Sequence, residues 1–159
     1  MKKLIFLAFA FVAIQARADL HLPSPEVETL PNGMRVAWFI DDKLPIIDLA
    51  LVINSGFRDD PEGKSGTVTL LSEMLERGSH QINTAEMARQ VEALGGSEYS
   101  DADDDAFSLG FHGLSKDADK FLELLGWMVQ EPNFDPKEFK TAQDRVRDQW
   151  KHLGDSAES

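Results

Sequence analysis

Apolar and polar residues along the first third of the chain follow a pattern that predicts strands. Residues 34–40 and 46–53 are rich in β-branched, aromatic and aliphatic side chains, and polar residues follow each run. The dipeptide Asn32-Gly33, which precedes the first run, predicts a tight turn. Further along, a polar segment leads into residues 106–111, where another strand is expected.

Four later segments carry apolar residues three and four positions apart, which is the spacing of one helix face. The first follows Gly66 and ends at Arg77-Gly78, and the second begins with capping-box spacing after Asn83. The fourth begins at Asp135, where an aspartate cap is followed by proline. The helices are expected over about 67–77, 83–94, 115–131 and 135–153.

The order of these elements is strand, strand, helix, helix, strand, helix, helix. It predicts an α+β domain in which helices pack on a mostly antiparallel sheet. The third helix has one apolar face, formed by Phe121, Leu124, Leu125 and Met128, which we assign to the core. The domain is expected over residues 30–159, after an extended, proline-containing lead-in at 19–29.

The first 18 residues have the pattern of a secretory signal peptide. Lys2 and Lys3 precede an apolar run over residues 4–14, and small residues at 16 and 18 predict cleavage after Ala18. The alternative is a short membrane anchor, but the run is well below the roughly 20 residues that span a bilayer. We therefore expect a periplasmic protein that has no membrane segment after cleavage.

Composition narrows the possible functions. The chain has 28 acidic and 16 basic residues, a formal net charge of −12, and the leader contains none of the acids. Such a surface disfavours binding to nucleic acids and anionic lipids. The absence of cysteine excludes disulfides, thiol catalysis, thiolate zinc sites and a lipoprotein anchor.

The order of motifs resembles the start of the insulinase/pitrilysin family of zinc metallopeptidases. The resemblance rests on the turn and strand at 30–36, the strand at 46–53, the Gly-Xaa-Arg-Xaa-Asp-Pro turn at 56–61 and the helix after Gly66. It implies the N-terminal domain of that family, of the LuxS/metallopeptidase-like fold. It extends over residues 27–159 and covers only part of one half of a family member, so we expect a fragment or a truncated product. Such a short piece is expected to be aggregation-prone or only marginally folded alone.

Active family members carry the inverted motif His-Xaa-Xaa-Glu-His, in which the histidines bind zinc and the glutamate activates water. The resemblance places these positions at Thr69, Ser72 and Glu73, and the third ligand, a glutamate on a later helix, at Gln149. Neutral threonine and glutamine oxygens are poor zinc ligands. No catalytic residue, metal or other cofactor is therefore expected, although active relatives hold zinc.

The resemblance also implies that the segment after Gly95-Gly96 borders a substrate cleft. The candidates for this cleft are Ser97, Glu98, Tyr99 and Ser100. The acidic run that follows, at 101–105, is interpreted as a solvated loop; the alternative is a negative cleft rim that attracts basic peptides. A calcium loop is excluded because its sixth and twelfth positions would be Ala106 and His112 instead of glycine and glutamate.

The four histidines are His21, His80, His112 and His152, and their scatter favours surface or packing roles. A rebuilt site that joins His112 and His152 stays open.

Three functions follow from the resemblance. The preferred one is a non-catalytic subunit that forms a heterodimer with a zinc-bearing relative and helps it bind and degrade or process peptides. One alternative is an active zinc-dependent endopeptidase with a rebuilt or distant site. The other is a structural assembly subunit, like the core proteins of the bc1 complex.

Overall fold

The computed structural model describes the backbone of residues 24–157 and the side chains of residues 24–148. The signal peptide expected at 1–18, with its cleavage site after Ala18, lies outside the described residues. The chain divides into two compact units, residues 1–43 and 44–159. Across the part of the chain that is described, no helix has the length and apolar character needed to cross a membrane.

The first unit contains an antiparallel hairpin of β1 (Glu26–Thr29) and β2 (Arg35–Trp38). Its turn is the one that the sequence predicts at Asn32-Gly33. Gly33 adopts a φ of 87°, in the left-handed region that favours glycine, and the Asn32 side chain accepts a hydrogen bond from the Met34 backbone at 3.0 Å. Residues 26–29, which were expected only to be extended, therefore form a strand because the turn brings them opposite β2.

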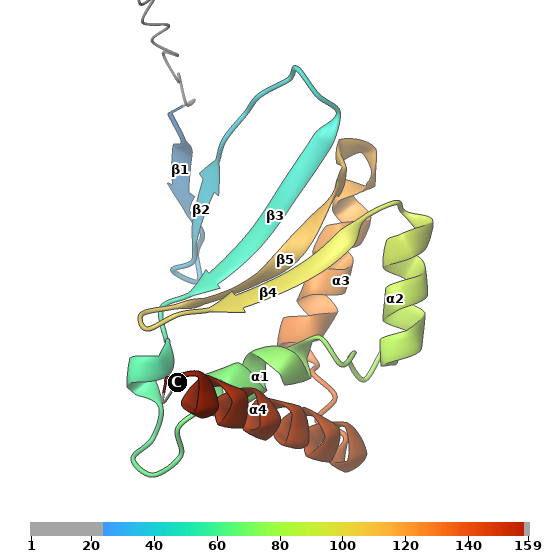
Figure 1. Ribbon diagram of the computed structural model, residues 1–159. Coiled ribbons are helices and arrows are strands. Elements are labelled where there is room, and N and C mark those ends of the chain that lie inside the picture. Colours follow the sequence, from blue (N-terminus) through green and yellow to red (C-terminus); the bar gives the residue numbers. More distant parts are fainter. Residues whose placement is uncertain (1–23, 158–159) are drawn as a thin grey trace, which may run out of the picture. The chain divides into compact units, whose positions relative to one another are not determined.

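The second unit is built on a three-stranded antiparallel sheet in the order β3-β5-β4 (Figure 1). Its strands are β3 (Ile46–Ile53), β4 (Ser97–Ala102) and β5 (Phe107–Leu114). The prediction of a single strand at 106–111 was incomplete, because the polar segment before it forms β4. This strand is at the edge of the described sheet and is held by its pairing with β5, so it does not need an apolar pattern of its own.

Four helices follow the predicted positions: α1 (Thr67–Leu75), α2 (Thr84–Ala93), α3 (Ala118–Gln130) and α4 (Pro136–Ala157). Two of the predicted caps are confirmed. The Asn83 side chain accepts from the Glu86 backbone at 2.9 Å, and the Asp135 side chain accepts from the Lys137 and Glu138 backbones at 2.8 and 3.1 Å. Short 3-10 turns, η1 (Phe57–Asp59) and η2 (Ser115–Asp117), precede α1 and α3.

The core lies between the sheet and the helices. Phe107, Leu109 and Phe111 of β5 are buried against the apolar faces of α1, α2 and α3. The Phe111 and Phe121 rings stack with centroids 5.5 Å apart. A Cβ at Gly113 would lie 2.4 Å from the Phe121 ring, so only glycine lets the strand approach the helix this closely. The predicted apolar face of α3 is thus the centre of the core.

Candidate functional site

The turn before α1 fixes the position of this helix. Gly66 adopts a φ of 90° and begins the helix without a side chain of its own to cap it. The Asp60 carboxylate instead accepts hydrogen bonds from the backbone of Gly66 at 2.5 Å and of Val68 at 2.9 Å. It satisfies two of the N–H groups that a helix start leaves free, and its negative charge suits the positive end of the helix dipole. The Gly-Xaa-Arg-Xaa-Asp-Pro turn therefore orients the face that carries positions 69, 72 and 73.

The acidic run at 101–105 is hydrogen-bonded to this turn, because the Phe57 and Arg58 backbone N–H groups donate to the Asp103 and Asp104 carbonyls. The run includes the end of β4 and most of the loop between β4 and β5, in which the Asp103 carboxylate accepts from the backbones of Asp105 and Ala106 at 2.8 and 2.9 Å. These hydrogen bonds hold the pKa of the Asp103 carboxyl below its ordinary value. The Arg58 side chain pairs with Asp104 and Asp105, and a Cβ at Gly56 would lie 2.4 Å from the Asp104 backbone. The run is an exposed turn that anchors η1, and its charges are partly compensated by Arg58.

Two of the former motif positions on α1 hold hydroxyl groups. Ser72 is buried, and its hydroxyl donates to the Thr69 carbonyl oxygen at 2.9 Å. Thr69 itself is half-buried. The Ser72 hydroxyl is therefore bonded within its own helix, and neither side chain can carry the charge that zinc binding or water activation requires.

The third motif position, Glu73, is held by two arginines. One carboxylate oxygen, Oε2, lies 3.4 Å from the Arg77 guanidinium and 3.3 Å from that of Arg145 on α4. Arg77 also pairs with Glu138 of α4 at 3.7 Å. The Glu73 and Arg77 side chains are only 15% and 16% exposed, so this pair is shielded from water more than ordinary surface pairs, whereas Arg145 is 50% exposed. A four-residue ionic cluster therefore joins α1 to α4 at the position that the sequence motif assigns to the second histidine.

Gln149 lies about one turn beyond Arg145 on α4. The ion pairs show that the two helices run antiparallel: Glu73 pairs with the later residue of α4 and Arg77 with the earlier one. Position 149 comes after Arg145, so it lies on the part of α4 that is nearer the N-terminal end of α1. The side chain of Gln149 is outside the described residues.

This donor set does not fit zinc. It offers two neutral hydroxyl groups and one carboxylate that is already engaged by two cations. Within the described side chains, residues 24–148, no group of three or more histidine, aspartate or glutamate residues is placed to hold a metal ion. His80 and His112 are exposed there, whereas His21 and the side chain of His152 are outside that range. The rebuilt site of His112 and His152 stays a hypothesis.

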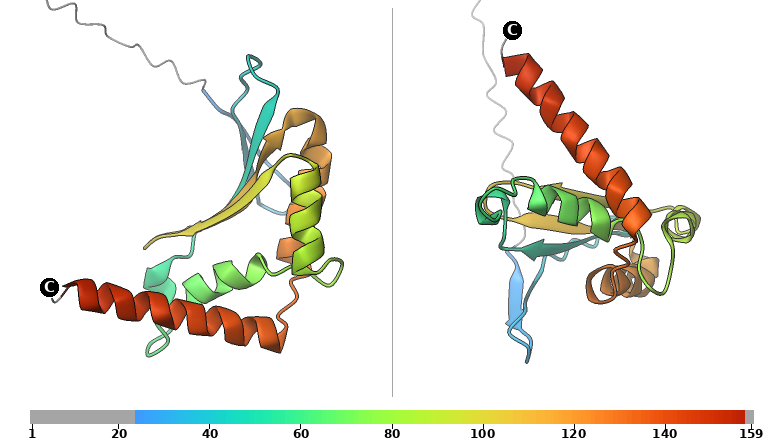
Figure 2. Two further views of the ribbon diagram at one scale, coloured as in Figure 1. Left: turned by 45° about the vertical axis from the view of Figure 1, so that its right-hand side comes forward. Right: turned by 90° about the horizontal axis from the view of Figure 1, so that it is seen from below.

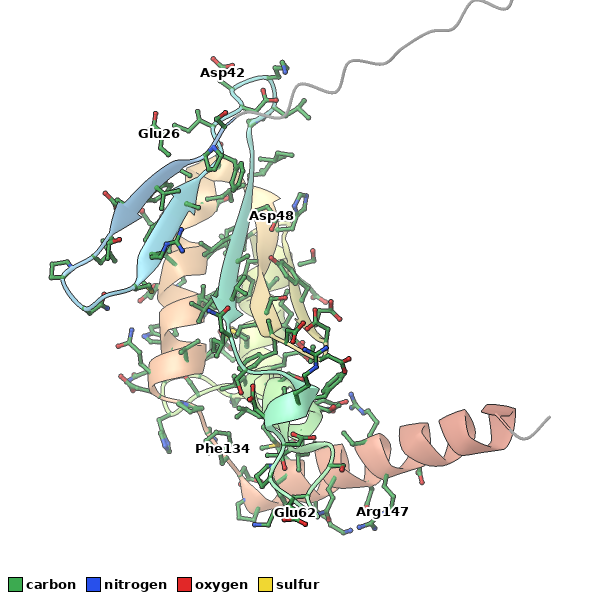
Figure 3. The ribbon with its side chains drawn as sticks, turned by 90° about the vertical axis from the view of Figure 1, so that its left-hand side faces the viewer. Glu26, Asp42, Asp48, Glu62, Phe134 and Arg147 are labelled. Atoms are coloured by element: carbon green, nitrogen blue, oxygen red, sulfur yellow. The ribbon has the colours of Figure 1, made fainter. Side chains whose placement is uncertain are left out.

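The four cleft candidates lie on β4, but they do not face the same side. Because side chains alternate along a strand, Glu98 and Ser100 share the face of Phe111 and Leu109, whereas Ser97 and Tyr99 share the opposite face with Asp48 and His112. Asp48 is labelled on β3 in Figure 3. Only Glu98 and Ser100 are therefore on the side of the sheet that α1 covers.

Glu98 and Tyr99 have shifted acidities. Burial raises the pKa of the Glu98 carboxyl, the neighbouring Glu76 carboxylate raises it further, and its Oε2 has no hydrogen-bond partner among the described residues. Burial is also the main cause that raises the pKa of the Tyr99 hydroxyl, and the charge of Asp48 raises it further. The Tyr99 hydroxyl donates a hydrogen bond to the Asp48 carboxylate at 3.1 Å. His112 Nδ1 lies 3.8 Å from the same aspartate.

Residues 35–158 match the family described as Insulinase (Peptidase family M16). The match covers most of the chain, so the protein belongs to this family. The family resemblance and the fold class expected from the sequence are both confirmed.

Two relatives and one solved structure are similar over most of the chain. The chain is 26% identical to mitochondrial-processing peptidase subunit beta of Blastocladiella emersonii, over 75% of this chain and 26% of that protein. It is 27% identical to human cytochrome b-c1 complex subunit 1, over 87% of this chain and 29% of that protein. A crystal structure of a protease from Helicobacter pylori superposes with a TM-score of 0.74 at 25% identity, over 80% of this chain and 31% of that one. The chain thus spans less than a third of the length of each.

The sequence motif located α1, but it missed the ionic cluster. The spacing of Glu73 and Arg77, four apart on a helix, was a local signal for one pair. The contribution of Arg145 had no such signal, because 72 positions separate it from Glu73 and only the packing of α4 on α1 brings them together.

Proposed function

We propose that this chain is a non-catalytic member of the M16 family, which works beside a zinc-bearing relative. The observation that carries the proposal is the pairing of Glu73 with Arg77 and Arg145 at the position of a zinc ligand. A metal ion there would lie beside two guanidinium groups. Like charges about 4 Å apart repel by about 4 kcal/mol per unit pair at an effective dielectric constant of 20. Loss of the ligands is thus accompanied by a gain of positive charge that opposes a metal.

A role as a partner subunit follows from the names of the relatives. One is a subunit of a processing peptidase and another a subunit of a respiratory complex, so similar chains work in assemblies of several proteins. We propose a heterodimer in which the partner supplies zinc and this chain helps to hold a peptide. The leader at residues 1–18 supports placing this heterodimer in the periplasm.

Strand β4 is the element proposed to contact the peptide. It is an edge of the described sheet, and an edge strand has backbone groups that an extended peptide can pair with. Ser97, Glu98, Tyr99 and Ser100 lie along it and would alternate toward the two sides of such a peptide.

A structural assembly subunit is the second candidate function. It is favoured by the match to cytochrome b-c1 complex subunit 1, which extends over 87% of this chain. The two candidates differ in one requirement: a peptidase partner needs a zinc-bearing protein beside it, whereas an assembly subunit does not.

The test has two parts. The first is the zinc content of the purified full-length protein, prepared without chelator and compared with a zinc-bearing family member prepared identically. We expect no bound zinc in this protein and one zinc per chain in the control. One zinc per chain in this protein would overturn the proposal and favour an active enzyme with a rebuilt site.

The second part is co-purification from the native cell envelope, followed by a peptidase assay. We expect a zinc-bearing M16 protein in the complex and higher peptidase activity of that protein when this chain is added. A stable complex that contains no zinc-bearing peptidase would instead support the assembly subunit. Glu73→Ala serves as a control in the assay at high salt, with a thermal melt to verify that it is folded: an active site built on Glu73 would lose its activity, whereas a folded non-catalytic subunit keeps its effect.

A further inference from the structure

A groove runs along α1 and α4 where the two helices meet. It encloses about 790 Å³ and is lined by apolar side chains from both helices and from the loop before α4. Its large apolar side chains are Leu70, Leu71, Met74, Phe134, Phe139 and Val146. In the right-hand view of Figure 2, α4 runs at an angle to α1, and its C-terminal half extends away from the rest of the unit.

Two aromatic rings remain exposed at one end of the groove. Phe134 is 51% and Phe139 is 41% exposed, although large apolar side chains of this kind are ordinarily buried. They are near the N-terminal end of α4, whereas Arg147 is farther along the same helix (Figure 3). A contiguous exposed apolar surface in a folded protein typically marks an interaction site.

The other end of the groove is positive. Among the described residues that line it, the charged ones are Lys64 and Arg147, and no carboxylate is included, although acids outnumber bases by 28 to 16 in the chain. Arg147 lies 3.8 Å from Asp144, and both side chains are more than half exposed, so this pair is weak. Glu62 is in the same loop as Lys64 but outside the lining. The N-terminal end of α1 adds little positive charge, because Asp60 already caps it, so the positive character of this end rests on Lys64 and Arg147.

We infer that this groove binds an amphipathic helix that carries acidic residues at one end. Apolar side chains of the bound helix fill the space between α1 and α4 and cover Phe134 and Phe139. Its acidic residues lie against Lys64 and Arg147. The lining on α1 extends from Gly66 to Met74, about 12 Å along the axis, which is enough for two turns of a bound helix.

The inference does not rest on the proposed function. The groove is formed by Leu70, Met74, Phe139 and Arg147, none of which belongs to the former ligand set, and it can bind a helix whether or not the chain holds zinc. Failure of either proposal therefore leaves the other intact.

Binding of a labelled synthetic helix to the full chain, followed by fluorescence anisotropy, tests the inference. The probe has about 18 residues, with leucine at every third and fourth position and three glutamates in its first turn. The control probe has lysines in place of these glutamates. We expect a Kd on the order of 10 µM for the acidic probe and binding at least about tenfold weaker for the basic one.

Two variants locate the binding. Phe139→Ala removes an exposed ring at one end, and we expect about tenfold weaker binding. Arg147→Glu reverses the charge at the other end, and we expect about tenfold weaker binding of the acidic probe with a smaller dependence on salt. Lys137→Glu makes the same charge change on α4 outside the groove lining and should leave binding unchanged. Thermal melts of all three variants verify that each one is folded.

Any of four outcomes would overturn the inference. One is the absence of binding at probe concentrations of about 1 mM. Another is equal affinity for the acidic and basic probes, or equal affinity in all three variants. The last is self-association of the chain that Phe139→Ala abolishes, because the groove would then hold a second copy of this chain.

Discussion

Helices α1 and α3 pack on the same face of the sheet, but they are held by different kinds of contact. The buried side chains of α3 are all apolar: Phe121, Leu124, Leu125 and Met128. Helix α1 also buries apolar residues, but Ser72 lies among them, Asp60 caps its start, and Glu73 on its other side is paired with arginines.

The difference shows which contacts each helix needs to keep its place on the sheet. A helix that only fills the core needs an apolar stripe, and α3 has one. The apolar residues of α1 are sufficient to place this helix on the sheet. The other face of α1 does not have to be apolar. In active family members that face binds a metal, whereas here it carries an ionic contact to α4. Substitutions in the apolar face of α3 should therefore lower the free energy of unfolding by the same amount at low and high salt. For substitutions in the ionic face of α1, the loss should depend on the salt concentration.

The largest effect is expected for Phe121→Ala. The Phe121 side chain is fully buried and packs against Phe111, Gly96 and Gly113, so its loss leaves a cavity in the core. We expect a loss of about 3–5 kcal/mol in the free energy of unfolding, measured by urea denaturation. Leu122→Ala, next to it on the exposed side of α3, is the matched control and should cost less than about 1 kcal/mol. Similar losses for the two variants would contradict the role of this apolar face.

Glu73→Ala should have the next largest effect, because it leaves Arg77 and Arg145 facing each other without the carboxylate. We expect a loss of about 2 kcal/mol at low salt. The loss should decrease in about 1 M NaCl, where the repulsion between the arginines is screened.

Asp144→Ala, which changes an acid of α4 outside this cluster, is the control for Glu73→Ala. A Glu73→Ala variant as stable as the native chain at low salt would show that the cluster does not hold α4 on α1. The proposed opposition to zinc would then lose its physical basis.

Asp60→Ala should cost about 1–2 kcal/mol, because two backbone N–H groups at the start of α1 lose their acceptor. Asp60→Asn keeps an acceptor oxygen but not the charge, and we expect it to restore about half of the loss. Thermal denaturation with helix content followed by circular dichroism measures both. Equal losses in the two variants would mean that the charge, and not the hydrogen bonds, stabilises the helix.

The smallest effect concerns the pH dependence of stability through Glu98. Its raised pKa means that folding favours the protonated form; the stabilisation is complete below the ordinary value of 4.5 and is lost as pH rises through the raised folded value. Glu98→Gln imitates the protonated form. At pH 7 it should stabilise the chain by only a few tenths of a kcal/mol, because the carboxyl stays partly in water.

Stability curves at pH 4 and pH 7 verify the Glu98 prediction. The gain of Glu98→Gln over the native chain should be present at pH 7 and absent at pH 4. Glu92→Gln, an exposed residue of α2, should show no gain at either pH. A gain that is equal at both pH values would exclude titration of Glu98 as its cause.

Much of the fold could be predicted because its signals are local. The turn at Asn32-Gly33, the caps at Asn83 and Asp135 and the stripe of α3 depend on residues within a few positions of one another. Strand β4 was missed for the opposite reason. Its residues are largely polar, and it is a strand because β5 offers a complete row of hydrogen-bond partners, from His112 to Phe107.

The candidate site divides in the same way. The motif frame located Thr69, Ser72 and Glu73 on one helix, and the structure places them on α1 as expected. What replaces the metal ligands could not be derived from the frame, because the decisive cation, Arg145, comes from a helix that begins more than 60 residues later. The groove between α1 and α4 was missed as well, since it depends on the angle at which the two helices cross.

The sequence by itself determined the family, the order of most elements and the residue types at the positions that the motif frame assigns, Thr69, Ser72 and Glu73. These follow from residue identity and from spacing over a few positions, which are properties of the local chain. Only the tertiary structure decided that β4 is a strand, that Glu73 is enclosed by two arginines and that α1 and α4 leave an apolar groove between them. Each of these depends on contacts between distant segments, and their energies are set by how the helices and strands pack together.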